Sequence, residues 1–100
     1  MQISVRRSGG FAGLTEQLAT VDTETLEPAR RRSVEEAVRD SDFFHLAAVI
    51  AGGTTGADLY RYEVSITDAG RSHTVAYGDS DDPETAPVRR LVETVTQRGP

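Results

Sequence analysis

The chain has 100 residues, of which 37% are hydrophobic and 27% are charged, and its formal net charge at pH 7 is −5. We expect residues 1–100 to form one domain, because a chain of this length supports about one hydrophobic core. The negative charge argues against a nucleic acid as the partner, since phosphate binding needs a positive field, and the absence of Cys excludes disulfides and thiolate chemistry.

The first segments of the chain predict a β-hairpin. Residues 2–7 alternate, with Ile3 and Val5 on one face, as the residues of a half-buried strand do. Residues 14–21 (LTEQLATV) resume an extended pattern after the glycine-rich connection SGGFAG. We therefore expect two strands joined by a long turn.

A helix is predicted over residues 28–40. Pro28 suits the first helical turn, which needs no N–H donor from that residue. Asp22 or Thr25 could act as a capping residue just upstream, and apolar residues recur at spacings of three and four. The two adjacent phenylalanines of the following SDFFHL are expected to seal the end of this helix.

The second half of the chain predicts another hairpin and a final helix. Residues 59–68 (LYRYEVSITD) and 71–79 (RSHTVAYGD) alternate on either side of a tight connection made by Asp68, Ala69 and Gly70. The acidic loop that follows lacks the glycine and the distant Glu of a calcium-binding EF-hand, so we expect it to be solvated. Apolar residues at i, i+3, i+4 and i+7 then predict a helix over about 84–97.

These elements define the expected fold. The order is ββαββα, in which four strands form an antiparallel sheet and two amphipathic helices cover one of its faces. This is a two-layer α+β arrangement.

The sequence offers little support for catalysis. His45 and His73 are the only histidines, and the chain has no HExxH, no CxxC and no histidine pair at helical spacing. We expect His73 to pack beside the sheet and His45 to be a partly buried structural residue. The glycines do not match a dinucleotide-binding fingerprint. We therefore predict a binding protein with no catalytic residue, no cofactor and no metal of its own.

The N-terminal residues MQISVRRSGG contain no apolar segment of the kind found in signal peptides. No apolar run approaches the ~20 residues that a membrane helix needs. We expect a cytoplasmic monomer without a membrane partner, while export by a route that uses no such signal stays open.

The chain resembles the emfourin family in five consecutive elements: RRSGGFAGL, VDTETLEP, a helix that ends in DFFHL, YRYEVSITDAGRSHTV and a C-terminal helix. The emfourins are small bacterial inhibitors of protealysin-like zinc metalloproteases, which are relatives of thermolysin. The resemblance covers nearly the whole chain, and residues 78–86 are its least distinctive part. It implies a non-catalytic inhibitor whose partner is a thermolysin- or protealysin-like protease.

The resemblance also implies that a short acidic and apolar loop enters the protease active site. A thermolysin-type zinc has an open fourth position that holds water, and a carboxylate of the inhibitor can take that position. In this chain Asp22 or Glu24 could supply the carboxylate, and Leu26 could fill the hydrophobic specificity pocket. The candidate protease-binding loop is Asp22, Thr23, Glu24, Thr25, Leu26, Glu27 and Pro28.

The same loop has a purely local interpretation that stays open at this point. Asp22 or Thr25 could cap the helix that follows, and Leu26 could staple that helix to the core.

A second candidate loop lies in the first hairpin. Its glycines would allow close approach of the backbone to a protease cleft, and its phenylalanine is either an apolar contact or part of the core. It could act together with the first loop only if the topology brings both to one edge of the sheet. The residues are Gly9, Gly10, Phe11, Ala12 and Gly13.

An alternative function is a cytoplasmic interaction or regulatory module that has no protease target. Such a module would use the outer face of the sheet, where Arg61, Glu63, Ser65 and Thr67 line up.

Overall fold

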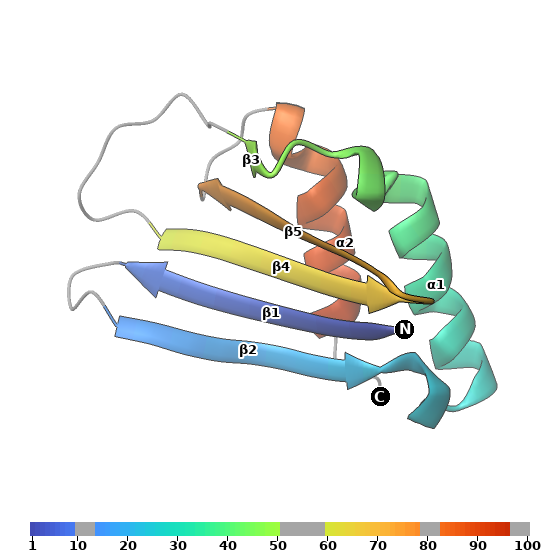
Figure 1. Ribbon diagram of the computed structural model, residues 1–100. Helices are drawn as coiled ribbons and strands as arrows, with labels where there is room; N and C mark the ends of the chain where they lie inside the picture. The colour runs from blue at the N-terminus through green and yellow to red at the C-terminus, as the bar shows by residue number, and fades with distance from the viewer. Residues whose placement is uncertain (10–13, 51–59, 79–82, 97–100) are drawn as a thin grey trace.

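The computed structural model describes residues 1–9, 14–50, 60–78 and 83–96. In these ranges one β-sheet is covered on one face by two α-helices (Figure 1), so the α+β class predicted from the sequence is confirmed. The strands are β1 (Gln2–Gly9), β2 (Leu14–Asp22), β3 (Val49–Ile50), β4 (Tyr60–Asp68) and β5 (Arg71–Gly78). The helices are α1 (Pro28–Ser41) and α2 (Ala86–Thr96), and the single-turn 3₁₀ helices are η1 (Thr23–Thr25), η2 (Phe43–His45) and η3 (Pro83–Thr85).

The described part of the sheet has five strands in the order β2-β1-β4-β5-β3, so the prediction of four antiparallel strands is wrong in one respect. Val49 and Ile50 form a short fifth strand, which runs parallel to β5 and pairs with Ala76 and Tyr77. The Ala76 N–H also donates to the carbonyl of Ala48 at 2.8 Å. Two residues are too few to show the alternation by which the other strands were predicted.

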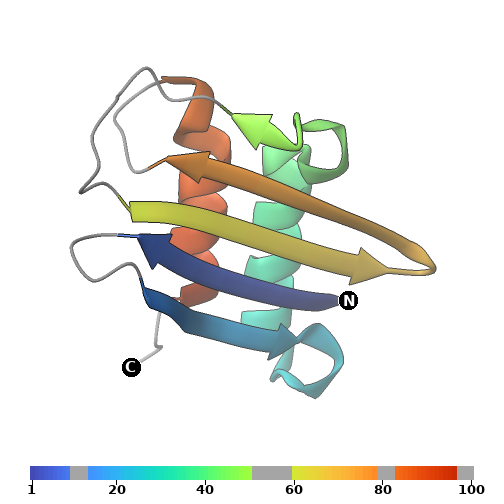
Figure 2. The same cartoon turned by 60° about the vertical axis from the view of Figure 1, so that its left-hand side comes forward.

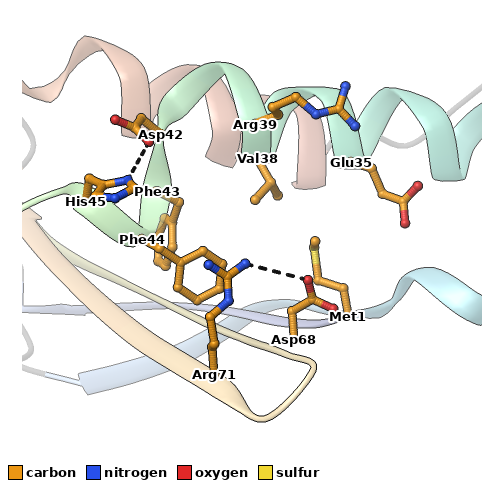
Figure 3. A pocket seen from close by; sticks show the side chains of 10 residues that line it. All are labelled: Met1, Glu35, Val38, Arg39, Asp42, Phe43, Phe44, His45, Asp68 and Arg71. Carbon is orange, nitrogen blue, oxygen red and sulfur yellow. Dashed lines mark hydrogen bonds and ion pairs between the residues drawn. The ribbon is translucent and has the colours of Figure 1, made fainter.

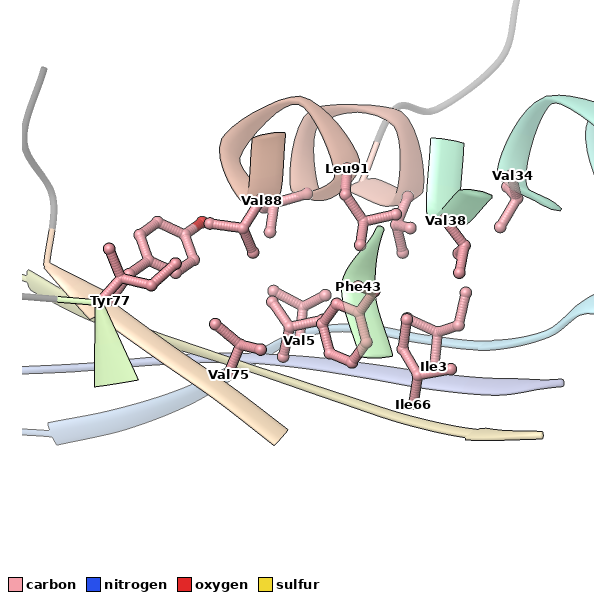
Figure 4. Close-up of a cluster of buried hydrophobic side chains, with 14 residues drawn as sticks. Ile3, Val5, Val34, Val38, Phe43, Ile66, Val75, Tyr77, Val88 and Leu91 are labelled. Carbon is pink, nitrogen blue, oxygen red and sulfur yellow. The ribbon is translucent and has the colours of Figure 1, made fainter. Parts of the chain in front are cut away.

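The core lies between the helices and the inner face of the sheet, as Figure 4 shows. In β1, β4 and β5 the buried hydrophobic residues occupy alternate positions, so they share this face of the sheet. Phe43, from η2, is only 1% exposed and closes the core beyond the end of α1, as the sequence predicted. Among the described residues, the remaining buried hydrophobic side chains are Ile3, Val5, Val34, Val38, Ile50, Val64, Ile66, Val75, Tyr77, Val88, Leu91, Val92 and Val95.

The ends of α1 follow from local chemistry. Pro28 occupies the first helical turn, as predicted, and the preceding N-cap residue, Glu27, makes no side-chain capping bond. The helix ends at Asp42, which adopts a left-handed conformation with φ of 53°. That turn redirects the chain into η2 and places Phe43 under the sheet.

The β4–β5 hairpin has a tight turn where the sequence predicted one, but the turn has two residues because Asp68 still belongs to β4. Asp68 pairs with Arg71, and between them Ala69 and Gly70 both have positive φ, at 51° and 82°. Positive φ at both positions gives the twist that matches two antiparallel strands.

Different segments of the chain lie at the two ends of the sheet. Figure 2 shows both helices running across the strands on the same side. Met1, η1 and the β4–β5 turn lie at one end, whereas Gly9, Leu14 and Tyr60 lie at the other. Among the described residues, no helix is both long enough and apolar enough to span a bilayer.

Candidate functional site

The segment η1 follows β2 directly and is fixed to the start of β1. Thr23 is completely buried, and its N–H donates to the Met1 carbonyl at 2.9 Å. The Thr23 hydroxyl donates to the same oxygen at 3.3 Å. Because both bonds end on the residue that precedes β1, η1 is held against the sheet and does not depend on its own short helical turn for its position.

Local hydrogen bonds fix the shape of η1. The Asp22 carboxylate accepts from the Glu24 N–H at 3.1 Å, so Asp22 is the N-cap of this 3₁₀ helix. The Thr25 hydroxyl donates to the Asp22 carbonyl at 2.8 Å, and the Leu26 N–H donates to the Thr23 carbonyl at 3.3 Å. Asp22 therefore acts on η1, whereas the local interpretation of the sequence assigned its cap to the longer helix.

The two acidic candidates differ in availability. One oxygen of Asp22 is engaged in the cap, and the residue is half-buried. Glu24 is exposed, and its carboxylate has no partner among the residues that the structure describes. Glu24 is therefore the more exposed of the two carboxylates, whereas Asp22 keeps only its second oxygen outside the capping bond.

Leu26 and the residues after it connect η1 to α1. Leu26 is half-buried and packs against the core, so only part of its side chain faces outward. Glu27 and Pro28 are exposed, and the Glu27 carbonyl accepts from the Arg31 N–H at 2.9 Å in the first turn of α1. The segment thus presents a charged group beside a partly exposed apolar one.

The two candidate loops lie at opposite ends of the sheet. In the β1–β2 pairing Gln2 faces Asp22 and Gly9 faces Leu14, so the full length of the hairpin separates them (Figure 1). At the usual rise per residue this separation is about 24 Å. Gly9 is described and has φ of 93°, while the rest of the second candidate loop, residues 10–13, lies outside the described residues. The two loops therefore do not form one surface.

The histidines occupy structural positions. His73 is half-buried, packs edge-on against Phe43 with ring centroids 5.5 Å apart, and has its Nε2 2.8 Å from the Leu46 carbonyl. His45 is exposed and its Nδ1 lies 2.7 Å from an oxygen of Asp42, so the prediction that His45 is partly buried is wrong. The left-handed turn at Asp42 rotates that side chain outward. Within the described ranges, no three potential metal ligands gather.

On the outer face of the sheet, several polar side chains interact with one another. Glu63 forms an ion pair with Arg6, and the hydroxyls of Ser65 and Thr74 lie 2.9 Å apart. Arg61 and Thr67 are exposed on the same strand. The alignment of these residues on one face was predicted correctly, but the charge of Glu63 is already neutralised within the chain.

Arg7 links three strands near the far end of the sheet. It donates to Glu16 at 2.6 Å, and its guanidinium carbon lies 4.3 Å from the ring centroid of Tyr60. The hydrogen bond to Glu16 raises the pKa of Arg7 above its usual value, and a hydrogen bond to Tyr62 has the next largest effect in the same direction. Arginine is already charged across the accessible pH range, so this contact is a structural link between strands.

A hollow of about 400 Å³ beside Met1 was not foreseen from the sequence (Figure 3). Its walls come from α1, η2 and the β4–β5 turn. Arg71 lies over the ring of Phe44, 4.1 Å from its centroid, and 4.0 Å from Asp68. No sequence pattern could have shown it, because the lining residues belong to elements far apart in the chain.

The described fold and site define a small α+β protein with a rigid acidic segment at one end of its sheet. The chain matches the family model described as Emfourin over residues 5–96, and it therefore belongs to the Emfourin family. This agrees with the resemblance found in its sequence. No curated protein and no solved structure matches the chain significantly.

Proposed function

We propose that this protein inhibits a thermolysin-type zinc metalloprotease by placing η1 in the active site of that enzyme. Membership of the Emfourin family supports an inhibitory role. The observation that carries the proposal is the carboxylate of Glu24, which is exposed and has no partner among the described residues.

The chemistry of the zinc site favours a carboxylate. The metal of such a protease is held by three protein ligands and keeps its fourth position for water or substrate. An oxygen of Glu24 replaces that water and blocks the position that peptide hydrolysis requires. Asp22 serves as a positioning residue, because its oxygen holds the N–H of Glu24 in the cap.

The rigidity of η1 favours tight binding. Thr23 is bonded to Met1 and the Thr25 hydroxyl to the Asp22 carbonyl, so the segment loses little conformational freedom when it binds. Leu26 follows Glu24 by two residues, and its exposed part covers the hydrophobic pocket next to the zinc. Leu26 does not have to leave the core of the inhibitor for this contact.

Titration of purified protealysin-like and thermolysin-like proteases with this protein tests the proposal. We expect peptide hydrolysis to fall to zero near a one-to-one ratio with at least one of these proteases. Full activity of every protease at tenfold excess would contradict it.

A pair of variants tests the role of Glu24. The variant Glu24→Gln should raise the inhibition constant by about 100-fold, since it removes a charge-assisted metal contact in a dry site. The matched control is Glu36→Gln, which makes the same charge change at an exposed position on α1. Equal inhibition by the two variants would remove Glu24 from the mechanism.

A further inference from the structure

Strand β2 is an edge of the described sheet and leads directly into η1. It pairs with β1 on one side, and no described strand pairs with its other side. Such an edge offers a row of main-chain donors and acceptors to another chain. This edge ends two residues before Glu24.

The direction of each main-chain group of β2 follows from its pairing. The N–H of Thr23 donates to β1, and Asp22 is extended, with φ of −109° and ψ of 112°. Because successive residues of a strand alternate in direction, the N–H of Asp22 and both main-chain groups of Thr20 point away from the sheet. The β1–β4 register is continuous, so alternate residues of β1, including Arg7 and Gly9, direct their main-chain groups toward β2. Thr15 and Gln17 lie between the partners of these residues, so their main-chain groups point away from the sheet.

An irregularity divides this edge into two halves. The register shifts between Val5 and Arg6, which face Ala19 and Gln17, so Leu18 is an additional residue on β2. The Gln17 side chain spans the shift and donates to the Ala19 carbonyl at 3.0 Å and to Thr20 Oγ1 at 3.0 Å. A bulge of this kind twists an edge away from long pairings, so β2 offers two short regular stretches, of which the one from Ala19 to Asp22 adjoins η1.

A hollow of about 310 Å³ lies beside the stretch that adjoins η1. Thr20 and Asp22 form one of its walls, and Gln2, Ser4 and Ser65 contribute to the rest. A strand added at this edge would direct alternate side chains toward the same face as Thr20 and Asp22. The hollow can accept one such side chain.

We propose that the main chain from Thr20 to Asp22 pairs with an extended segment of the protease that borders its zinc site. The inference rests on the proposed function and adds a second point of attachment to it. Asp22 and Glu24 are at most about 7 Å apart along the chain, so the paired segment lies within that reach of the metal. Main-chain pairing provides affinity without requiring a particular sequence in the partner.

The partner is the protease and not a second copy of this chain. Two copies of β2 that paired about a two-fold axis would need a long regular edge, and the bulge at Leu18 interrupts it near its middle. A short pairing next to η1 needs only the residues from Thr20 to Asp22.

Hydrogen exchange of the intact protein tests the inference. The probe is the ¹⁵N-labelled inhibitor, free and bound to whichever protease it inhibits. The amides of Thr20 and Asp22 should exchange fast in the free protein and at least about tenfold more slowly in the complex. The amides of Thr15 and Gln17 provide the internal control and should keep their rates.

Proline variants give an independent test of the same contact. Thr20→Pro removes an outward N–H, which an edge strand tolerates, and should raise the inhibition constant by at least about tenfold. Thr15→Pro also removes an outward N–H, at the other end of β2, and should leave that constant unaltered. Thr20→Val removes the Thr20 hydroxyl that accepts from Gln17 but keeps the N–H, and should leave the constant nearly unaltered too. Thermal melting of both proline variants shows whether each retains the fold, and hydrogen exchange of the unaltered protein decides the question if Thr20→Pro does not.

The outcomes separate the two proposals. Absence of inhibition by the unaltered protein overturns both of them. Inhibition with unchanged exchange at Thr20 and Asp22 overturns only the edge contact. Slow exchange of these amides in the free protein, together with a concentration-dependent dimer, also overturns it, in favour of self-association.

Discussion

Met1 and Thr23 are joined by two hydrogen bonds that end on one carbonyl oxygen. The Thr23 N–H donates at 2.9 Å and its hydroxyl at 3.3 Å. The first residue of the chain thereby fixes the start of η1, which would otherwise be a single exposed helical turn between β2 and α1. Because a buried threonine holds the segment, its position should depend on a residue that no partner touches.

We expect Thr23→Val to lower the free energy of unfolding by about 1 kcal/mol, since it removes one hydroxyl bond and keeps the shape of the side chain. It should also raise the inhibition constant by about threefold to tenfold, because η1 would then be held less firmly. Urea denaturation and a protease titration measure the two effects. Thr23→Ser, which retains the hydroxyl, should restore inhibition, and unchanged values for Thr23→Val would refute the anchoring role.

Variants of Asp22 should separate capping from metal binding. We expect Asp22→Asn to keep both stability and inhibition close to those of the unaltered protein, because asparagine caps a helix as well as aspartate does. Asp22→Ala should lower the free energy of unfolding by about 1 kcal/mol. If Asp22→Asn abolished inhibition without loss of stability, Asp22 and not Glu24 would be the group that reaches the zinc.

Leu26→Ala should weaken both the fold and the inhibition, in contrast to Glu24→Gln. Leu26 packs against the core with part of its side chain, so its truncation should lower the free energy of unfolding by about 1–2 kcal/mol. Under the proposed function, the exposed remainder contacts the protease, so inhibition should also weaken. Chemical denaturation of the two variants side by side provides the measurement, and a Leu26→Ala variant that inhibits normally would remove this residue from the site.

The β4–β5 turn offers a test of the fold that does not involve the site. Ala69 has φ of 51°, which is unfavourable for a residue with a Cβ, so Ala69→Gly should raise the free energy of unfolding by about 0.5–1 kcal/mol.

The opposite exchange in this turn serves as the control. Gly70→Ala should lower the free energy of unfolding, because Gly70 has φ of 82°, although an added Cβ would meet no atom within 4 Å. Thermal melting detects both changes. If the turn has the described conformation, the two variants must change the free energy of unfolding in opposite directions.

The sequence predicted most of the fold because its strands alternate and its helices carry apolar stripes. The short strand at Val49 and Ile50 was not predicted, because two residues show no periodic pattern. Its place in the sheet depends on β5, which is distant in the sequence. The exposure of His45 was also not predicted, because its apolar neighbours in the sequence suggested burial. The left-handed turn at Asp42 sets the direction of this side chain.

The segment from Asp22 to Pro28 was selected as a candidate site from its composition and its resemblance to a family, and its function as a site stays a prediction. The capping bond of Asp22 needs coordinates. The separation of the two candidate loops was implicit in the predicted hairpin, since a turn and the far end of its second strand lie apart. The hollow next to Met1 had no signal in the sequence, because its walls meet only after folding.

The proximity of Met1 to η1 has a practical consequence for handling this protein. Any residues attached ahead of Met1, such as an affinity tag, would emerge beside Thr23 and close to Glu24. A large enzyme approaching that end would meet the tag first. Recombinant material with an uncleaved N-terminal tag should therefore inhibit more weakly than the same material after the tag is removed, although both would melt at similar temperatures.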